Sequence, residues 1–164
     1  MNAGDWDWTA IGVAASVAVV CGLAGGLLTT IGPWYKGLRL PSWKPPDWAF
    51  GPVWTTIFVL AVVSSVMAWG ADARPEARWA LLVAYGVNVV LNIAWSAIFF
   101  RMRRPDWAFV EVIALWVSVV ALIVVTAQMS AVAALLLLPY LTWVSVASYL
   151  NLTIVRLNAP FASG

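Results

Sequence analysis

The chain has 164 residues, of which 63% are hydrophobic and 10% charged, and its net charge at pH 7 is +2. A soluble domain carries about a quarter charged residues, so this composition excludes a soluble globular protein and predicts a membrane protein. The small net charge, scattered over several loops, excludes a nucleic-acid-binding surface. The absence of histidine removes the commonest metal and haem-iron ligand, and the single cysteine, Cys21, rules out an intrachain disulfide. We therefore predict no metal and no cofactor.

Five apolar segments follow one another along the chain, each close to the ~20 residues that a helix needs to cross about 30 Å of hydrocarbon. Barrel strands are much shorter, so these segments are helices. The sequence predicts an all-α membrane protein, a bundle of five transmembrane helices that forms a single domain over residues 1–164. The predicted spans are 8–30, 49–70, 79–100, 107–128 and 131–155.

The first span carries Gly22 and Gly26 at GxxxG spacing, which lets another helix approach its backbone closely. Ala80 and Ala84 repeat this spacing in the third span. Either pair could pack within the monomer or against a second copy, and we favour packing within the monomer.

A segment rich in proline and tryptophan, residues 40–54, connects the first two spans and is called the Pro/Trp loop below. It holds four prolines and three tryptophans. Proline fixes φ and lacks an N–H group, so Lys44-Pro45-Pro46 is predicted to be stiff and extended. Such a loop at the mouth of a membrane helix suits a lid or an anchor.

The basic residues predict the orientation in the membrane. Seven of the nine Lys and Arg residues lie on the side that holds the Pro/Trp loop, the 101–104 connection and Arg156. Only Arg74 and Arg78 lie on the opposite side. The positive-inside tendency therefore places the Pro/Trp loop and the C-terminus in the cytoplasm and the N-terminus outside.

Two asparagines in the third span, Asn88 and Asn92, share one helix face with Trp95. A membrane-embedded amide needs a hydrogen-bond partner, so both are expected to face the bundle interior. They either join helices or form the polar end of a ligand cavity, and the residue types alone favour joining helices.

The tryptophans near span ends fit an aromatic belt, whereas Trp54, Trp95, Trp116 and Trp143 lie deeper. Of the deeper residues, Trp54, Trp95 and Trp143, together with Asn92, fall within roughly 20 Å of the basic side, counted at 1.5 Å per residue. Core packing rarely needs three indoles whose N–H groups must also be satisfied. We therefore predict an aromatic cavity beneath the Pro/Trp loop.

Three cations lie above this predicted cavity: Lys36, Arg39 and Lys44. Their simplest role is to orient the chain, but they could also form a cationic rim for an anionic ligand. A flat apolar molecule with a carboxylate edge, such as a tetrapyrrole, has the matching shape and charge. A sterol has the apolar body but lacks the acid.

Two further residues carry specific expectations. Glu111, about one turn inside the fourth span, is expected to pair with Arg101, Arg103 or Arg104. Pro139 is expected to bend the fifth span and to free a carbonyl group that a neighbour must satisfy.

Several ordered motifs, spread over essentially the whole chain, resemble those of the TspO/MBR family of tryptophan-rich sensory proteins and translocator proteins. They are Trp34-Tyr35, Leu40-Pro41-Ser42-Trp43-Lys44-Pro45-Pro46, Gly51-Pro52-Val53-Trp54, Leu91-Asn92-Ile93-Ala94-Trp95, Ile98-Phe99-Phe100 and Pro139-Tyr140-Leu141-Thr142-Trp143.

The resemblance implies a five-helix bundle, commonly a homodimer, that binds porphyrins, sterols and benzodiazepine-site drugs. It implies ligand contacts at Trp54, Trp143 and Asn92, and further pocket positions at Gly25, Tyr35, Pro45, Phe58, Trp95 and Ala147. The predicted function is binding of porphyrin-like ligands in tetrapyrrole or stress sensing or in transport, in a bacterial cell membrane.

Two alternatives stay open: light-dependent porphyrin degradation with Trp54 and Trp143 as redox partners, and sterol or tetrapyrrole transport. The family's sterol-recognition aromatic is replaced here by Leu152, and Tyr149 is one residue too far from Arg156, which weakens a sterol role. Without histidine, metal-free porphyrin is expected to bind at least as well as haem.

Overall fold

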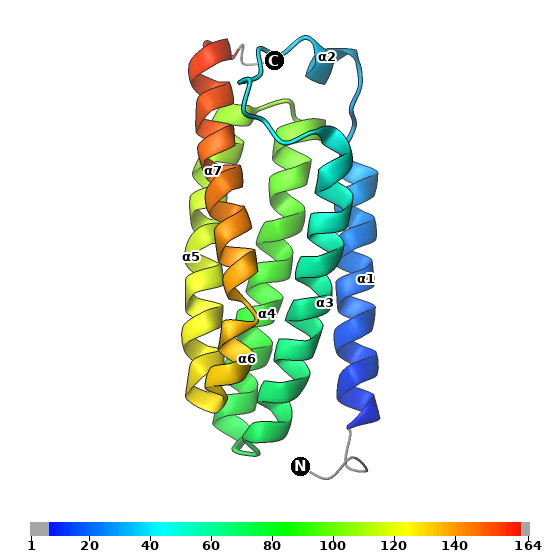
Figure 1. Ribbon diagram of the computed structural model, residues 1–164, viewed down its shortest axis with the longest axis vertical. Helices are drawn as coiled ribbons and strands as arrows, with labels where there is room; N and C mark the ends of the chain where they lie inside the picture. Colours follow the sequence, from blue (N-terminus) through cyan, green and yellow to red (C-terminus); the bar gives the residue numbers. More distant parts are fainter. Residues whose placement is uncertain (1–6, 162–164) are drawn as a thin grey trace.

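The computed structural model describes residues 7–161, so the outermost residues of the predicted domain, 1–6 and 162–164, lie outside this range. Five helices in it are long and apolar enough to cross a membrane, and they alternate in direction along one bundle (Figure 1). The predicted fold class is thereby confirmed. The helices are α1 (Trp8–Leu28), α3 (Asp47–Ala71), α4 (Pro75–Ser96) with the π-helical turn η1 (Ala97–Arg101), α5 (Pro105–Met129), and α6 (Ala131–Leu135) followed by α7 (Leu138–Asn158).

The helix α5 packs mainly against α4 and α7. Its buried residues recur every three or four positions, as in Ala108, Val112, Leu115, Val119 and Leu122, so one continuous face is in the core. By contrast, Cys21 is the one buried residue of α1. The other faces of α1 are therefore available to lipid.

The fifth span is interrupted at residues 136 and 137, between α6 and α7. Pro139 lies in the first turn of α7, where its missing N–H group costs little. The Ser64 hydroxyl of α3 donates to the carbonyl group of Ala133 at 2.8 Å. The span is broken near Pro139, as predicted, but the Ala133 carbonyl also accepts from the Leu136 N–H at 3.2 Å, so it is not the carbonyl that Pro139 frees.

The connection between α4 and α5 is tight and depends on an unusual residue. Arg103 has φ of 55°, in the left-handed region, and the Arg104 N–H donates to the Ile98 carbonyl at 3.1 Å. This is the helix-ending arrangement that usually places glycine at the left-handed position. Arg101 reaches the Leu27 carbonyl of α1 at 3.1 Å, and Arg104 pairs with Asp106.

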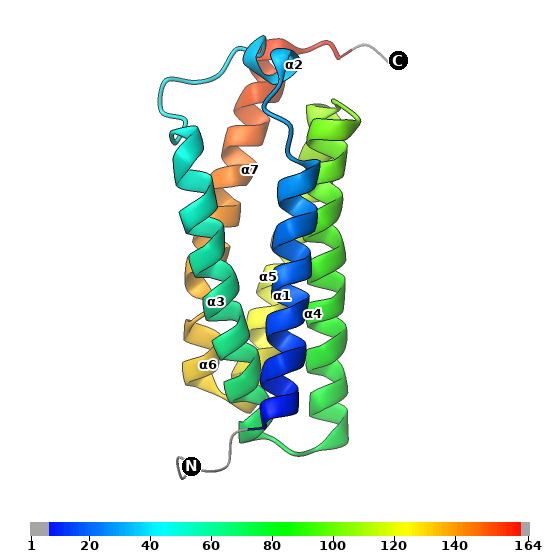
Figure 2. The same ribbon diagram turned by 90° about the vertical axis from the view of Figure 1, so that its right-hand side faces the viewer.

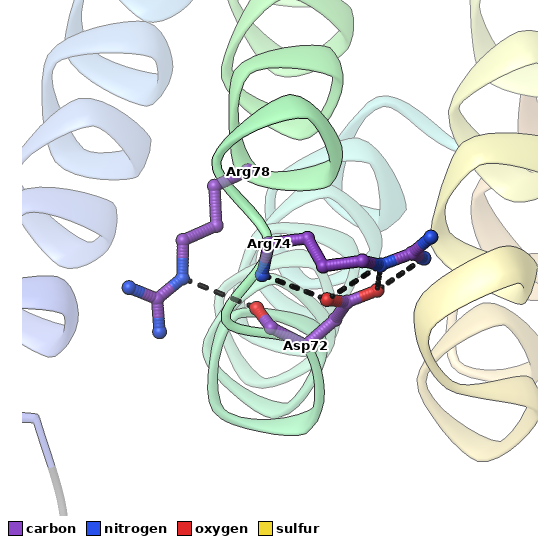
Figure 3. Close-up of polar contacts among 3 residues, drawn as sticks. All are labelled: Asp72, Arg74 and Arg78. Atoms are coloured by element: carbon purple, nitrogen blue, oxygen red, sulfur yellow. Dashed lines mark hydrogen bonds and ion pairs between the residues drawn. The ribbon is translucent and has the colours of Figure 1, made fainter.

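The connection between α3 and α4 is held by its own charges (Figure 3). Asp72 accepts from the Arg74 backbone N–H at 2.9 Å and from the Arg74 guanidinium, and these hydrogen bonds lower the pKa of the Asp72 carboxyl. Arg78 donates to the carbonyl groups of Asp72 and Trp69 at 3.1 Å each, and its guanidinium stacks 4.4 Å from the Trp69 ring. Both cations on this side of the bundle therefore stabilise the connection between α3 and α4.

Candidate ligand-binding cavity

A cavity of about 460 Å³ lies between α1, α3, α4, α5 and α7. It occupies the half of the bundle nearest the Pro/Trp loop, where α1 and α3 diverge (Figure 2). Its volume is in the range typical of small-molecule sites, about 300–1,000 Å³.

One wall of the cavity is aromatic and comes from α3 and α7. Phe50, Trp54 and Phe58 follow one another at four-residue intervals, so they share a face of α3. The Trp54 and Phe58 rings are stacked, with centroids 5.4 Å apart and planes at 27°. Phe50 meets Trp143 of α7 edge to face at 5.4 Å, and Ala147 lies one turn further along α7. This wall offers flat apolar surfaces.

The opposite wall is more polar and comes from α1 and α4. Cys21 and Gly25 of α1 lie one turn apart, as do Asn92 and Ser96 of α4. The Cys21 Sγ atom lies 3.6 Å from Asn92 Oδ1, to which it donates. A Cβ atom placed on Gly25 would lie 3.8 Å from Ser96 Oγ, so the second pair also meets across the two helices.

Asn92 also belongs to a chain of buried hydrogen bonds, called the amide–tyrosine chain below. Its Nδ2 donates to the Tyr140 hydroxyl at 3.0 Å, and that hydroxyl donates to Asn88 Oδ1 at 2.9 Å. Asn88 Nδ2 in turn donates to Ser118 Oγ at 2.9 Å. The chain runs from the cavity to α5 and connects α1, α4, α7 and α5.

The cavity opens sideways, between α1 and α3. Six of its lining residues are exposed on the outside of the bundle: Gly26, Thr29, Ile31, Asp47, Gly51 and Thr55. Deeper in the bundle the two helices come together where Gly22 meets the Phe58 ring, since a Cβ atom on Gly22 would lie 3.4 Å from it. We call this opening the side mouth.

The short helix α2 (Pro33–Lys36) lies at the end of the bundle (Figure 2) and contributes Tyr35 to the cavity lining. Tyr35 is buried, lines the cavity and packs on Phe100 with ring centroids 5.7 Å apart. Trp34 meets Phe99 edge to face at 6.1 Å. The sequence predicted no helix here; the Pro33 start and the aromatic anchors on η1 account for it.

The segment between α2 and α3 is tied to α7 at two points. Asn158 accepts from the Arg39 N–H at 2.8 Å and donates to the Arg39 carbonyl at 2.9 Å. Trp43 stacks on Tyr149 with centroids 5.2 Å apart. Pro46 is extended, with φ of −62° and ψ of 146°, as predicted for the double proline. The loop is therefore fixed over the cavity rather than free.

The sequence comparison agrees with this architecture. The model of the TspO/MBR family matches residues 13–157. The chain belongs to the TspO/MBR family. It is 37% identical to the tryptophan-rich protein TspO of Chlorobaculum tepidum over 90% of this chain and 95% of that protein. It is 32% identical to a tryptophan-rich sensory protein of Cereibacter sphaeroides over 94% of each chain, and 36% identical to the human translocator protein over 80% of this chain and 78% of that one.

Most of the residues predicted for the site of this TspO/MBR protein do line the cavity. They are Gly25, Tyr35, Trp54, Phe58, Asn92, Trp95, Trp143 and Ala147. Pro45 and Asn88 are not among the lining residues. Asn88 instead joins α4 to Tyr140 and Ser118, which is the helix-joining role that the sequence left open.

The three predicted rim cations lie near the cavity without lining it. Lys44 forms an ion pair with Asp47 and lies 6.0 Å from the centre of the Tyr35 ring. Arg39 is held through its backbone by Asn158, and the Lys36 side chain is exposed.

The prediction of an ion pair for Glu111 is wrong. Both of its carboxyl oxygens are buried, and neither has a hydrogen-bond partner in the described part of the chain. Because α5 begins at Pro105, Glu111 lies about 9 Å along the helix from that end. Arg104 and Arg101 bond to nearer groups, Asp106 and the Leu27 carbonyl.

Several lining residues were not predicted as site residues, and two of them belong to the polar wall: Cys21, which was considered only as a possible disulfide partner, and Ser96. Both could have been found from spacing. Ser96 is one helical turn beyond Asn92, and Cys21 is one turn before Gly25.

Proposed function

We propose that this protein binds a porphyrin, or a flat hydrophobic molecule of similar shape, in the cavity described above. The observation that carries the proposal is the pairing of an aromatic wall, with Trp54, Phe58 and Trp143, with a polar wall that holds Asn92. Aromatic faces bind a planar ring, while a few polar groups fix its orientation. The side mouth between α1 and α3 gives such a ligand a route into the cavity.

Binding is the step common to the activities that the family names suggest. Among the relatives, one is called a sensory protein and another a translocator protein. Sensing, transport and light-dependent breakdown of a porphyrin all begin with its capture in a site. The proposal is therefore binding, from which any of these activities would follow.

The test is a titration of purified protein with protoporphyrin IX, followed by the absorbance of the porphyrin. That signal does not depend on the number of tryptophans. The wild type is expected to saturate, and Trp143→Leu to bind about tenfold more weakly, since one aromatic face and its buried area are lost. Trp107→Leu is the matched control, because Trp107 is 58% exposed and is not a lining residue. Unsaturable binding by the wild type, or an equal loss in both variants, would contradict the proposal.

We further infer a bacterial cell membrane as the location, with the N-terminus outside, and a homodimer as the assembly. The excess of Lys and Arg on the Pro/Trp-loop side supports the orientation. Arg74 and Arg78, the two cations on the other side, form hydrogen bonds within the α3–α4 connection. Ala80, one of the small residues of α4, is exposed and available to a second copy.

A further inference from the structure

Ser96 is a buried polar residue whose side chain has no internal role. It is 8% exposed, lines the polar wall of the cavity and directly precedes the π-helical turn η1. Its hydroxyl makes no hydrogen bond to any described residue and does not cap η1. Such π-helical turns are frequent at functional sites.

Other helical hydroxyl groups near the cavity bond back to their own helix. Thr29 donates to the Gly25 carbonyl at 2.8 Å, Thr55 to the Gly51 carbonyl at 2.9 Å, and Ser148 to the Val144 carbonyl at 2.7 Å. This is the ordinary behaviour of serine and threonine in a membrane helix. The Ser96 hydroxyl lacks such a bond, so it is free to pair with a polar group that enters the cavity.

The space in front of Ser96 is open, because the residue across from it on α1 is Gly25. A Cβ atom at Gly25 would lie 3.8 Å from Ser96 Oγ, an ordinary van der Waals contact. The absence of that methyl group leaves the hydroxyl accessible from the cavity. Ser96 is therefore placed to bond to a ligand, whereas the amide of Asn92 already bonds to Cys21 and Tyr140.

A second unpaired donor belongs to a lining residue but does not face the cavity. The Trp143 Nε1 atom is buried and has no hydrogen-bond partner among the described residues. An indole N–H group can only donate. Because this atom is closed off from the cavity, the Ser96 hydroxyl is the unpaired donor that an acceptor oxygen of a ligand can reach.

The nearby cations do not supply this recognition inside the cavity. Lys36, Arg39 and Lys44 are not lining residues, and Lys44 is already paired with Asp47. We propose that Ser96 donates a hydrogen bond to a carboxyl group of the bound tetrapyrrole and is a specificity-determining residue of the cavity. This inference rests on the porphyrin binding proposed above.

The test compares two porphyrins that share a ring. Protoporphyrin IX has two propionic acid groups, whereas etioporphyrin has only alkyl groups. Ser96→Ala is expected to weaken protoporphyrin IX binding about tenfold, the effect of one hydrogen bond to a charged group, and to leave etioporphyrin binding unchanged.

Two further variants make the result specific. Ser148→Ala is the control, because it removes a hydroxyl that bonds to its own helix and does not line the cavity. Gly25→Ala leaves Ser96 in place but covers its hydroxyl, so it is expected to reproduce the selective loss.

The outcomes separate this inference from the function on which it rests. If the wild type binds protoporphyrin IX but Ser96→Ala binds it equally well, or loses affinity equally for both porphyrins, the role of Ser96 is overturned and the cavity proposal stands. If the wild type binds neither porphyrin, both are overturned.

Discussion

Tyr140 connects the cavity to the core through one hydroxyl group. It is 4% exposed, accepts from Asn92 and donates to Asn88, so its single hydroxyl satisfies two buried amides. A buried amide group without a partner is costly in hydrocarbon, and the amide–tyrosine chain removes that cost for both asparagines.

Tyr140→Phe is expected to lower the free energy of unfolding by about 1–3 kcal/mol, because it leaves a donor of Asn92 and an acceptor of Asn88 unpaired. Denaturant unfolding in detergent micelles measures this. Tyr149→Phe is the control, since Tyr149 is 60% exposed. Equal stability of the two variants would show that the amides find other partners.

Spacing predicted many of the lining residues, because hydrophobic periodicity determines which face of a helix turns inward. It could not separate Asn88 from Asn92, which share a stripe of α4 but lie at different depths. The expected ion pair of Glu111 failed for a different reason. Closeness in sequence to three arginines says nothing about which groups those arginines reach first. Arg104 reaches Asp106, and Arg101 reaches a carbonyl group of α1.

At the scale of elements, the connection between α4 and α5 carries a residue poorly suited to its conformation. Arg103 adopts φ of 55°, which is unfavourable for a side chain with a Cβ atom. Arg103→Gly is expected to raise the free energy of unfolding by about 1 kcal/mol. Thermal unfolding of the variant against Arg101→Gly, which removes the bond to the Leu27 carbonyl and is expected to destabilise, checks the sign.

The side mouth depends on small residues of α1 and α3. Gly26→Leu adds a side chain at the mouth, where no atom lies within 4 Å of the new Cβ, so the fold is expected to tolerate it. Porphyrin association and dissociation, measured by stopped flow, should both slow because the side mouth is narrower. The affinity should change little, because the aromatic wall and the polar wall of the cavity are unchanged.

Gly12→Leu provides the control for this experiment. Gly12 lies on the same helix, is equally open around its Cβ atom and is not a lining residue. Rates that are unchanged in Gly26→Leu, or slowed equally in both variants, would show that the ligand does not pass between α1 and α3.

Elements with a strong hydrophobic pattern were predictable, and the short ones were not. The five spans were found within about four residues, and the break near Pro139 follows from the chemistry of proline. The helix α2 and the turn η1 are four and five residues long, too short for periodicity to reveal. Both are set by tertiary aromatic contacts that the sequence alone does not display.

At the scale of the whole molecule, the orientation in the membrane can be tested by cysteine labelling, because the chain has a single cysteine. Cys21 is buried, so new surface cysteines can be labelled selectively. Ala73→Cys, in the α3–α4 connection, is expected to react with an impermeant thiol reagent added to intact cells. Ser42→Cys, in the Pro/Trp loop, should react only after the cells are permeabilised. Both positions are exposed, and the reverse pattern would invert the orientation.

The position of the side mouth determines which solvent supplies the ligand. An opening between two membrane helices meets acyl chains before it meets water, so the bilayer acts as the reservoir from which the cavity fills. A porphyrin that partitions strongly into lipid would then occupy the site at a low aqueous concentration, even with modest contacts inside. Apparent affinity should scale with the ratio of lipid to water in the sample, and two laboratories using different detergent amounts would report different constants for one unchanged site.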